Sequence, residues 1–378
     1  MTNDFDIAIC GAGPVGMALA VLLAQRGAAP QRIVLIDGKS VSETATDPRS
    51  IALSYGSRQI LEQVGAWPTI TDPIRQIHVS RRGHFGRTLI DCDEYGLPAL
   101  GYVARYGALV TALAAALDKT GIVSLRPARI TASNELADTV TLQLEDGRAI
   151  GARILVQAEG GVFDDQAARS LHRDYQQTAV IAQVTADAPI PHRAFERFTD
   201  EGPLALLPQG AGYALVWCMR PATAARISGL PDAAFLAELQ QAFGTRLGRF
   251  TGVSRRTAYQ LGLNAHPALS ARAVAIGNAA QTLHPVAGQG LNLGLRDAAV
   301  LARLLARDAE PAMLERYAQI RHADRSATIR LTDTMARIFS STPEGALSQT
   351  VLGLSLGLID AFKPAKQLLT EQMMFGRR

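Results

Sequence analysis

The chain has 378 residues, of which 48% are hydrophobic and 19% charged, so a packed core is expected and a disordered chain is excluded. Its length predicts two domains. The formal charge is only +4 and no run of Lys or Arg exceeds two residues, which argues against nucleic acid as a partner. The three cysteines lie far apart, so neither a disulfide framework nor a metal site is predicted.

Two further classes are excluded by the distribution of charge and apolar residues. Asp4 and Asp6 interrupt the start of the chain, so no signal peptide is predicted. No apolar run reaches the roughly eighteen residues that a membrane-spanning helix requires. We therefore expect a cytoplasmic protein.

The N-terminus predicts a β-α-β unit. An apolar run over residues 5–10 leads into Gly11, Gly13 and Gly16, a helix follows, and a second apolar run ends at Asp37. The three glycines allow a tight turn, the approach of backbone to a pyrophosphate, and close packing of helix on strand. Asp37 has the position of a carboxylate that accepts from a ribose hydroxyl. The unit predicts dinucleotide binding, although position alone does not separate FAD from NAD.

A loop at residues 47–50 follows this unit. Its Arg49 is placed to reach a phosphate or a flavin, and a surface arginine after a proline turn is the alternative. Apolar periodicity predicts helices over residues 55–64 and 106–117, with mixed strand and turn signals at residues 71–100 between them.

The middle of the chain predicts mainly strands. Residues 122–150 alternate in short segments with a hairpin signal at Asp146-Gly147, and residues 154–157 read as a buried strand. From residue 179 to residue 219, β-branched and aromatic residues recur between turns, which predicts an antiparallel sheet.

A glycine-rich motif occupies residues 276–297. A short apolar strand leads into a turn of small residues, and a helix begins near Gly288 to Gly290 with no side chains obstructing its free N–H groups. Such a helix start accepts an anion. Two of them in one chain suit FAD, with the pyrophosphate on the first and the flavin N1/O2 edge on the second. His284 in this motif is, taken alone, more typical of a packed histidine than of a catalytic one.

These motifs together resemble those of the class A flavoprotein monooxygenases, and more narrowly the ubiquinone-biosynthesis hydroxylases of the 2-octaprenyl-6-methoxyphenol hydroxylase type. The most specific matches are the Glu-Arg-Phe-Thr stretch at residues 196–199 and the motif at residues 276–297. The resemblance implies an α/β fold with a Rossmann-like FAD-binding domain, a β-sheet substrate domain like that of p-hydroxybenzoate hydroxylase, and a C-terminal helical segment. The implied spans are residues 1–70, 101–170 and 265–330 for the FAD-binding domain, 71–100 and 171–264 for the substrate domain, and 331–378 for the helical segment.

The resemblance also implies which residues hold FAD. The glycine turn would bind the pyrophosphate and Asp37 the adenosine ribose. Arg49 and Arg105 would contact the cofactor near its pyrophosphate, and Asn278 its ribityl or pyrophosphate region. The implied FAD-binding residues are Gly11, Gly13, Pro14, Gly16, Asp37, Arg49, Arg105, Glu159, Gly277, Asn278, Gly288, Gln289, Gly290, Leu291 and Asn292, and the implied catalytic residues near the flavin are His284 and Pro285.

The implied reaction is aromatic hydroxylation. NAD(P)H reduces FAD, O₂ adds at the flavin C4a, and the hydroperoxide passes its distal oxygen to an electron-rich phenol. A polyprenylated phenol resides in the membrane, because each buried CH₂ is worth about 0.8 kcal/mol. Residues 351–378 combine apolar side chains with Lys363 and Lys366, which is typical of a peripheral contact with the inner membrane face or with a quinone-biosynthesis complex. An ordinary helix packed on the catalytic body is the alternative.

Residues 158–160 depart from the family pattern. Glu159 stands where the family usually has Asp, and the Ser and Arg that follow in the family are not in register. In the family, this motif is associated with both FAD and NAD(P)H. The step that the substitution would affect is therefore the reduction of FAD by NAD(P)H. Two other functions are therefore kept open. One is a non-catalytic FAD-binding or scaffold subunit of a quinone-synthesis complex, and the other is a flavin hydroxylase of another aromatic compound.

Overall fold

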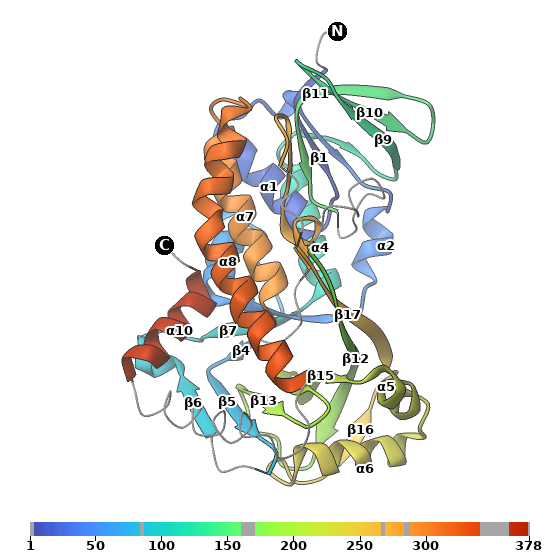
Figure 1. Ribbon diagram of the computed structural model, residues 1–378, viewed down its shortest axis with the longest axis vertical. Coiled ribbons are helices and arrows are strands. Elements are labelled where there is room, and N and C mark those ends of the chain that lie inside the picture. The colour runs from blue at the N-terminus through green and yellow to red at the C-terminus, as the bar shows by residue number, and fades with distance from the viewer. Residues whose placement is uncertain are drawn as a thin grey trace.

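The computed structural model describes residues 4–83, 87–159, 171–265, 269–282, 288–340 and 363–376 (Figure 1). The described helices are α1 (Pro14–Gln25), α2 (Val41–Ala45), α3 (Tyr55–Gln63), α4 (Tyr106–Asp118), α5 (Pro221–Ser228), α6 (Asp232–Phe243), α7 (Gln289–Leu305), α8 (Ala312–Ser340) and α10 (Lys363–Phe375). Short 3-10 turns are η1 (Pro30–Arg32), η2 (Cys92–Tyr95) and η4 (Gly277–Ala279).

The first sheet holds the N-terminal β-α-β unit. Its strand order is β8 (Val123–Leu125), β2 (Ile33–Ile36), β1 (Phe5–Cys10), β11 (Ala149–Gln157), β10 (Val140–Leu144) and β9 (Ile130–Glu135), with β18 (Ala273–Ala275) beside β11. The pairs among β8, β2, β1, β11 and β18 are parallel, whereas β9, β10 and β11 form an antiparallel meander. The hairpin predicted at Asp146-Gly147 is confirmed, since it joins β10 to β11. The carboxyl ends of β1 and β2 lie at one edge of the sheet.

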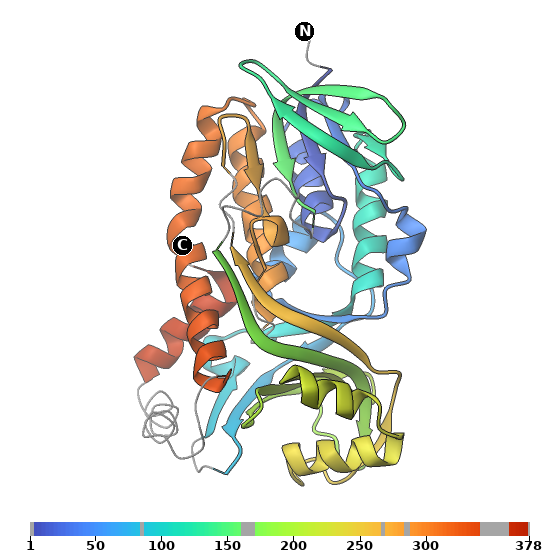
Figure 2. The ribbon, with the colours of Figure 1, turned by 45° about the vertical axis from the view of Figure 1, so that its right-hand side comes forward.

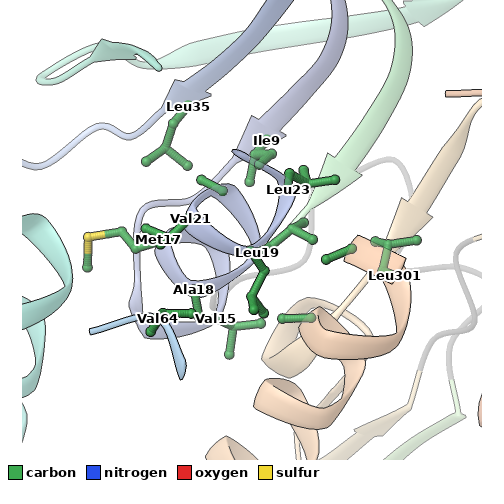
Figure 3. Close-up of a cluster of buried hydrophobic side chains, with 14 of the residues drawn as sticks. Ile9, Val15, Met17, Ala18, Leu19, Val21, Leu23, Leu35, Val64 and Leu301 are labelled. Atoms are coloured by element: carbon green, nitrogen blue, oxygen red, sulfur yellow. The ribbon is translucent and has the colours of Figure 1, made fainter. Parts of the chain in front are cut away.

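Both faces of this sheet are covered, which is why its parallel strands are continuous apolar runs. Helices α1, α4 and α7 cover one face, and Leu19, Leu23 and Leu301 belong to the buried cluster there (Figure 3). On the other face, Ala8 and Val34 belong to a cluster with residues of the β9–β10 meander. Burial of each Leu side chain stabilises the fold by about 1.5–3 kcal/mol.

The second sheet is larger and mostly antiparallel. Its strand order is β19 (Gln281–Thr282), β17 (Thr257–Ala265), β12 (Leu171–Ala186), β15 (Gly212–Met219), β14 (Pro203–Gln209), β13 (Arg193–Phe198), β5 (Gln76–Arg81) and β6 (Arg87–Asp91), with β16 (Phe250–Val253) beside β12. The long strands β12 and β17 run from this sheet toward the first one (Figure 2).

Alternation along the strands gives the second sheet an outer and an inner face. Phe195 and Trp217 point to the outer face, where their rings lie 5.4 Å from Phe243 and 6.1 Å from Phe235 of α6. Glu196, the neighbour of Phe195 on β13, therefore belongs to the inner face.

A three-stranded sheet connects the two large ones. It pairs β3 (Ser50–Ser54) and β4 (Asp72–Ile74) with β7 (Gly101–Arg105). Strand β4 thus pairs with β7, which the sequence analysis placed in the other domain. The domain boundaries stay a prediction, because the sheets show only which segments pair.

The C-terminal helices lie against the body of the molecule. Helix α8 packs along α7 (Figure 1). At the end of α10, Met374 is 4% exposed and the ring of Phe375 lies 6.2 Å from that of Tyr55 in α3. The packed-helix alternative therefore holds for this end of α10, whereas residues 351–362 lie outside the described residues. Within the described residues, no helix is both long and apolar enough to cross a membrane.

Candidate functional site

The glycine turn between β1 and α1 leaves no space for a side chain at Gly11 or Gly16. Gly11 has a φ of +106°, and a Cβ there would lie 2.5 Å from the backbone nitrogen of Glu159. A Cβ at Gly16 would lie 1.9 Å from the Gly11 carbonyl oxygen. Gly13 is the N-cap of α1 and Pro14 its first residue, with no capping side chain and no acidic residue in the first turn. The backbone N–H groups of this helix start are thus available to an anion.

Asp37 lies at the same place. Its carboxylate accepts from the backbone N–H of Ala12 at 2.6 Å and from that of Lys39 at 2.7 Å. Glu159, two residues after the end of β11, is close to Asp37. Burial first and Asp37 second raise the pKa of the Glu159 carboxyl. The structure therefore brings Asp37 and Glu159 together beside Gly11.

The two arginines named by the resemblance have different neighbours. Arg49 donates to the carboxylate of Asp47 through Nε and Nη2, and its guanidinium lies 4.9 Å from the ring centre of Tyr106. Tyr106 reaches the glycine turn, since its hydroxyl would be 3.7 Å from a Cβ on Gly13. Arg49 is thus connected to that turn through one aromatic ring.

Arg105 instead meets the second sheet. With the Gln183 amide turned to satisfy its neighbours, its oxygen accepts from Arg105 at 3.1 and 3.2 Å. Gln183 also lies 3.2 Å from the Oε1 of Gln209, which accepts from the hydroxyl of Ser50 at 2.8 Å. These contacts join β3 and β7 to the inner face of the second sheet.

A second helix start lies at α7. Its N-cap, Gly288, has a φ of +59°, and there is no capping side chain and no acidic residue in the first turn, which contains Gln289, Gly290 and Leu291. Asn278 in η4 is exposed, and its Oδ1 would lie 3.7 Å from a Cβ on Gly290. His284 and Pro285 lie outside the described residues.

Asn292 fixes this helix start through its side chain. Its Oδ1 accepts from the Ser54 amide at 2.8 Å and from the Ser57 hydroxyl at 2.7 Å. Its Nδ2 donates to the carbonyls of Gly288 at 2.7 Å and Ala52 at 3.1 Å. All four contacts are internal to the fold, so only the backbone of Asn292 is left for a cofactor.

The two helix starts are held close together. A Cβ at Gly294 of α7 would lie 2.7 Å from Cγ2 of Val15 in α1 and 3.0 Å from Cα of Gly277. Only glycine permits this approach of α7 to α1. Two uncapped helix starts beside a glycine turn fit a cofactor with a pyrophosphate and a second electron-rich end, as FAD has.

Comparison with known proteins agrees with this geometry. The model of a family described as "FAD binding domain" matches residues 4–332. The chain belongs to this FAD-binding family.

Two relatives of this flavoprotein show which members of the family it is similar to. Ubiquinone hydroxylase UbiL of Rhodospirillum rubrum is 32% identical over 98% of this chain and 89% of its own length. The 3-demethoxyubiquinol 3-hydroxylase of Escherichia coli is 32% identical over 86% of this chain and 87% of its own length. The flavoprotein is an FAD-dependent monooxygenase, with NAD(P)H as the co-substrate typical of the family.

Solved structures share the fold. The p-nitrophenol 4-monooxygenase PnpA of Pseudomonas putida superimposes with a TM-score of 0.77, covering 100% of both chains at 16% identity. A variant of HpxO from Klebsiella pneumoniae, solved with FAD, gives 0.74 over 98% of this chain and 99% of its own at 14% identity. The predicted fold, with a Rossmann-like FAD-binding part and a β-sheet part, is thereby confirmed.

Sequence reasoning missed the role of Asp297. This fully buried carboxylate accepts from Arg321 at 2.7 Å and from Gln281 at 3.1 Å, and lies 3.5 Å from Arg325. Burial alone would raise the pKa of Asp297, but Arg325 and Arg321 hold it below its usual value. The glycine-rich motif ends at Asp297, but its arginine partners lie in α8.

Glu196 is the second residue that sequence reasoning missed. It belongs to the motif at residues 196–199, to which no chemistry was assigned. Burial raises the pKa of the Glu196 carboxyl to about 7. Burial and the nearby Glu196 also raise the pKa of the Cys218 thiol. The register places Glu196 on the same inner face as Gln183 and Gln209.

Proposed function

We propose that this flavoprotein hydroxylates the aromatic ring of a polyprenylated phenol in ubiquinone biosynthesis. The observation that carries the proposal is that two relatives named as hydroxylases of ubiquinone or demethoxyubiquinol match most of this chain at 32% identity. The helix starts of α1 and α7 support it, because they suit the two ends of FAD. FAD, once reduced by NAD(P)H, supplies the activation of O₂.

The chain's own residues would hold the cofactor as follows. The N–H groups after Gly13 would bind the pyrophosphate, and Asp37 the adenosine ribose. Arg49 would contact the pyrophosphate region, exchanging part of its bond with Asp47 for the cofactor. The backbone from Gly288 to Asn292 would face the pyrimidine edge of the flavin, which gains negative charge on reduction, so the positive end of α7 favours the reduced state by about 1 kcal/mol.

The inner face of the second sheet would form one wall of the substrate site. Small side chains line it near Glu196, among them Ala205 of β14 and Val216 of β15. Glu196 supplies a carboxyl with a pKa near 7, the property that a general base working at neutral pH requires. We therefore propose that Glu196 accepts the proton of the phenol hydroxyl. A substrate of this class also requires contact with a membrane. We assign this contact to residues 351–378, in which apolar side chains lie beside Lys363 and Lys366 in the sequence.

The test uses the purified full-length protein with FAD. We expect a yellow protein whose oxidation of NADH or NADPH is stimulated by an octaprenylated phenol in detergent, with one atom of ¹⁸O₂ found in the ring of the product. Bound FAD without phenol-dependent oxidation would favour the scaffold function. Turnover of soluble phenols alone would favour the hydroxylase of another aromatic compound. Protein that binds no FAD would overturn the proposal.

A further inference from the structure

A cavity of about 360 Å³ lies on the outer face of the second sheet, away from the helix starts of α1 and α7. Its lining comes from β5, β6, β13 and the loop after α6. His78 on β5 pairs in register with Phe195, whose ring lies 5.8 Å from the His78 ring and packs on α6. In Figure 1, β5, β13 and α6 lie at the end of the molecule opposite β1 and the glycine turn. The cavity is therefore separate from the FAD site.

Three of the five residues that line the cavity are arginines. Its residues are His78, Arg87, Leu89, Arg193 and Arg246. Arginines in α5 and in the loop after α6 do have acidic partners. Arg226 pairs with Glu238 and Arg249 with Asp187. Among the described residues, none of the three cavity arginines forms an ion pair with a carboxylate within 4 Å.

One of these arginines, Arg193, is held in place by two hydrogen bonds to a side chain. The Nε and Nη2 of Arg193 donate to Oε1 of Gln76 at 2.8 and 2.6 Å. The Nε2 of Gln76 in turn donates to Asp91 at 2.6 Å. Gln76 thus orients the guanidinium of Arg193 and keeps Asp91 behind it, outside the cavity lining.

The electrostatics show that the positive charges repel one another, although the charge of Arg193 is partly offset by Asp91, whose pKa it lowers. Burial first, then Arg246, Arg193 and Arg87, lower the pKa of His78 to about 4. Burial, Arg87 and Arg193 likewise lower the pKa of Arg246. His78 is therefore neutral at pH 7, and its Nδ1 lies 3.4 Å from Nη1 of Arg246. Three guanidinium groups around one cavity repel one another, and an anion between them would remove that cost.

We propose that this cavity binds a phosphate group, with Arg87, Arg193 and Arg246 donating to its oxygens. Planar guanidinium groups bind phosphate through paired N–H donors more specifically than ammonium groups do. Leu89, which is 36% exposed, adds an apolar edge against which a group attached to the phosphate can pack. Both a soluble phosphate ester and the headgroup of an anionic lipid offer this chemistry.

The first test follows His78 by NMR in the full-length holoprotein labelled with ¹³C-histidine. Inorganic phosphate is titrated at constant ionic strength against sodium chloride. A bound anion favours imidazolium, so we expect a saturable rise of about one unit or more in the pKa of His78. A pKa of His78 that responds equally to phosphate and chloride would overturn the proposal.

Variants test the assignment of the donors. Arg87→Gln, on the exposed edge strand β6, should weaken phosphate binding roughly tenfold, and Arg87→Gln with Arg246→Gln more than this. Arg249→Gln is the matched control, because Arg249 lies on the same loop as Arg246 but points to Asp187. Binding should change less than twofold in this control. Equal losses in all variants would show a nonspecific charge effect and contradict the proposal.

A flotation assay separates the two sources of phosphate. Vesicles of phosphatidylcholine with phosphatidic acid are compared with vesicles of phosphatidylcholine alone. Co-flotation that depends on phosphatidic acid and on Arg87, but not on Arg249, identifies a lipid headgroup. Phosphate binding by NMR with no such co-flotation identifies a soluble phosphate ester. Failure of both assays refutes the site.

Discussion

The carboxylate of Asp297 in α7 accepts a hydrogen bond from the backbone N–H of Gly277, 3.3 Å away at the start of η4. Asp297 is fully buried and is also bound by Arg321 of α8. One side chain therefore fixes the turn that carries Asn278 to the helix that begins at Gly288. The position of the proposed flavin-binding backbone therefore depends on a fully buried charge.

Asp297→Asn should destabilise the protein strongly. The substitution keeps the shape of the side chain but removes the carboxylate that faces the half-buried Arg325 and one carboxylate of Arg321, which keeps its pair with Asp324. Loss of one partner in a buried ion pair costs about 3–5 kcal/mol, and the remaining Asp324 places the expected cost at the lower end of this range. Urea unfolding measures this cost, and the rate of FAD release should rise with it. Asp308→Asn, at an exposed position beyond the end of α7, is the control and should change stability by less than about 0.5 kcal/mol. Equal stability of the two variants would contradict this account.

Gly16→Ala should abolish FAD binding. The added Cβ would meet the Gly11 carbonyl oxygen at 1.9 Å, so the glycine turn must open. Gly38→Ala is the matched control, because no heavy atom lies within 4 Å of a Cβ at that position. Flavin absorbance after gel filtration compares the two variants. Retention of FAD by Gly16→Ala would show that the turn does not hold the pyrophosphate.

Arg49→Ala tests a cofactor contact apart from stability. The Arg49–Asp47 pair is partly exposed to solvent, so its loss should cost about 1 kcal/mol or less. FAD affinity should nevertheless fall roughly tenfold, because a charge-assisted contact to the pyrophosphate is lost. Arg148→Ala is a close control, since Arg148 pairs with Asp146 in the same Asp-X-Arg geometry. An unchanged FAD affinity in Arg49→Ala would support the alternative that Arg49 is a surface arginine with no contact to the cofactor.

Glu196→Gln should remove a pH dependence of stability. The pKa of Glu196 is raised to about 7 in the folded protein from an ordinary value of 4.5. The neutral carboxyl therefore stabilises the fold fully below pH 4.5, and this stabilisation is lost as pH rises through 7. The loss amounts to about 3 kcal/mol. Urea unfolding between pH 5 and pH 8.5 should show the slope in the parent and a smaller one in the variant. Glu145→Gln, at an exposed position, should leave the slope unchanged.

The same variant tests the proposed base. If Glu196 accepts the phenol proton, Glu196→Gln should lower kcat for hydroxylation by about 10²-fold or more. It should also remove the acidic limb of the pH profile, while FAD content stays normal. A merely structural Glu196 would leave the pH profile in place. Normal kcat with a normal profile would therefore exclude this role.

Much of the FAD-binding part was predictable because its signals are local. The glycines at positions 11, 13 and 16 and the apolar runs on either side define the turn within some thirty residues of chain. The helix starting near Gly288 was likewise predictable, from glycines that add no side chain to its start. The hydrogen bonds of the Asn292 side chain were not predictable, because its partners Ser54 and Ser57 lie more than 230 residues away in the sequence. Arg105 was expected beside the cofactor, yet the contact found for it is Gln183 on the other sheet.

Length and composition by themselves determined a folded protein, and the glycine motif between two apolar runs determined the dinucleotide site. Hydrophobic periodicity and glycine geometry act over a few residues, so the sequence expresses them directly. Only the tertiary structure decided that Asp297 fixes the turn at Gly277 and that Glu196 is a half-buried carboxyl on the inner face of the second sheet. It also decided that Arg87, Arg193 and Arg246 surround one cavity. Desolvation and charge repulsion depend on which side chains meet in space, and strands far apart in the chain bring these together.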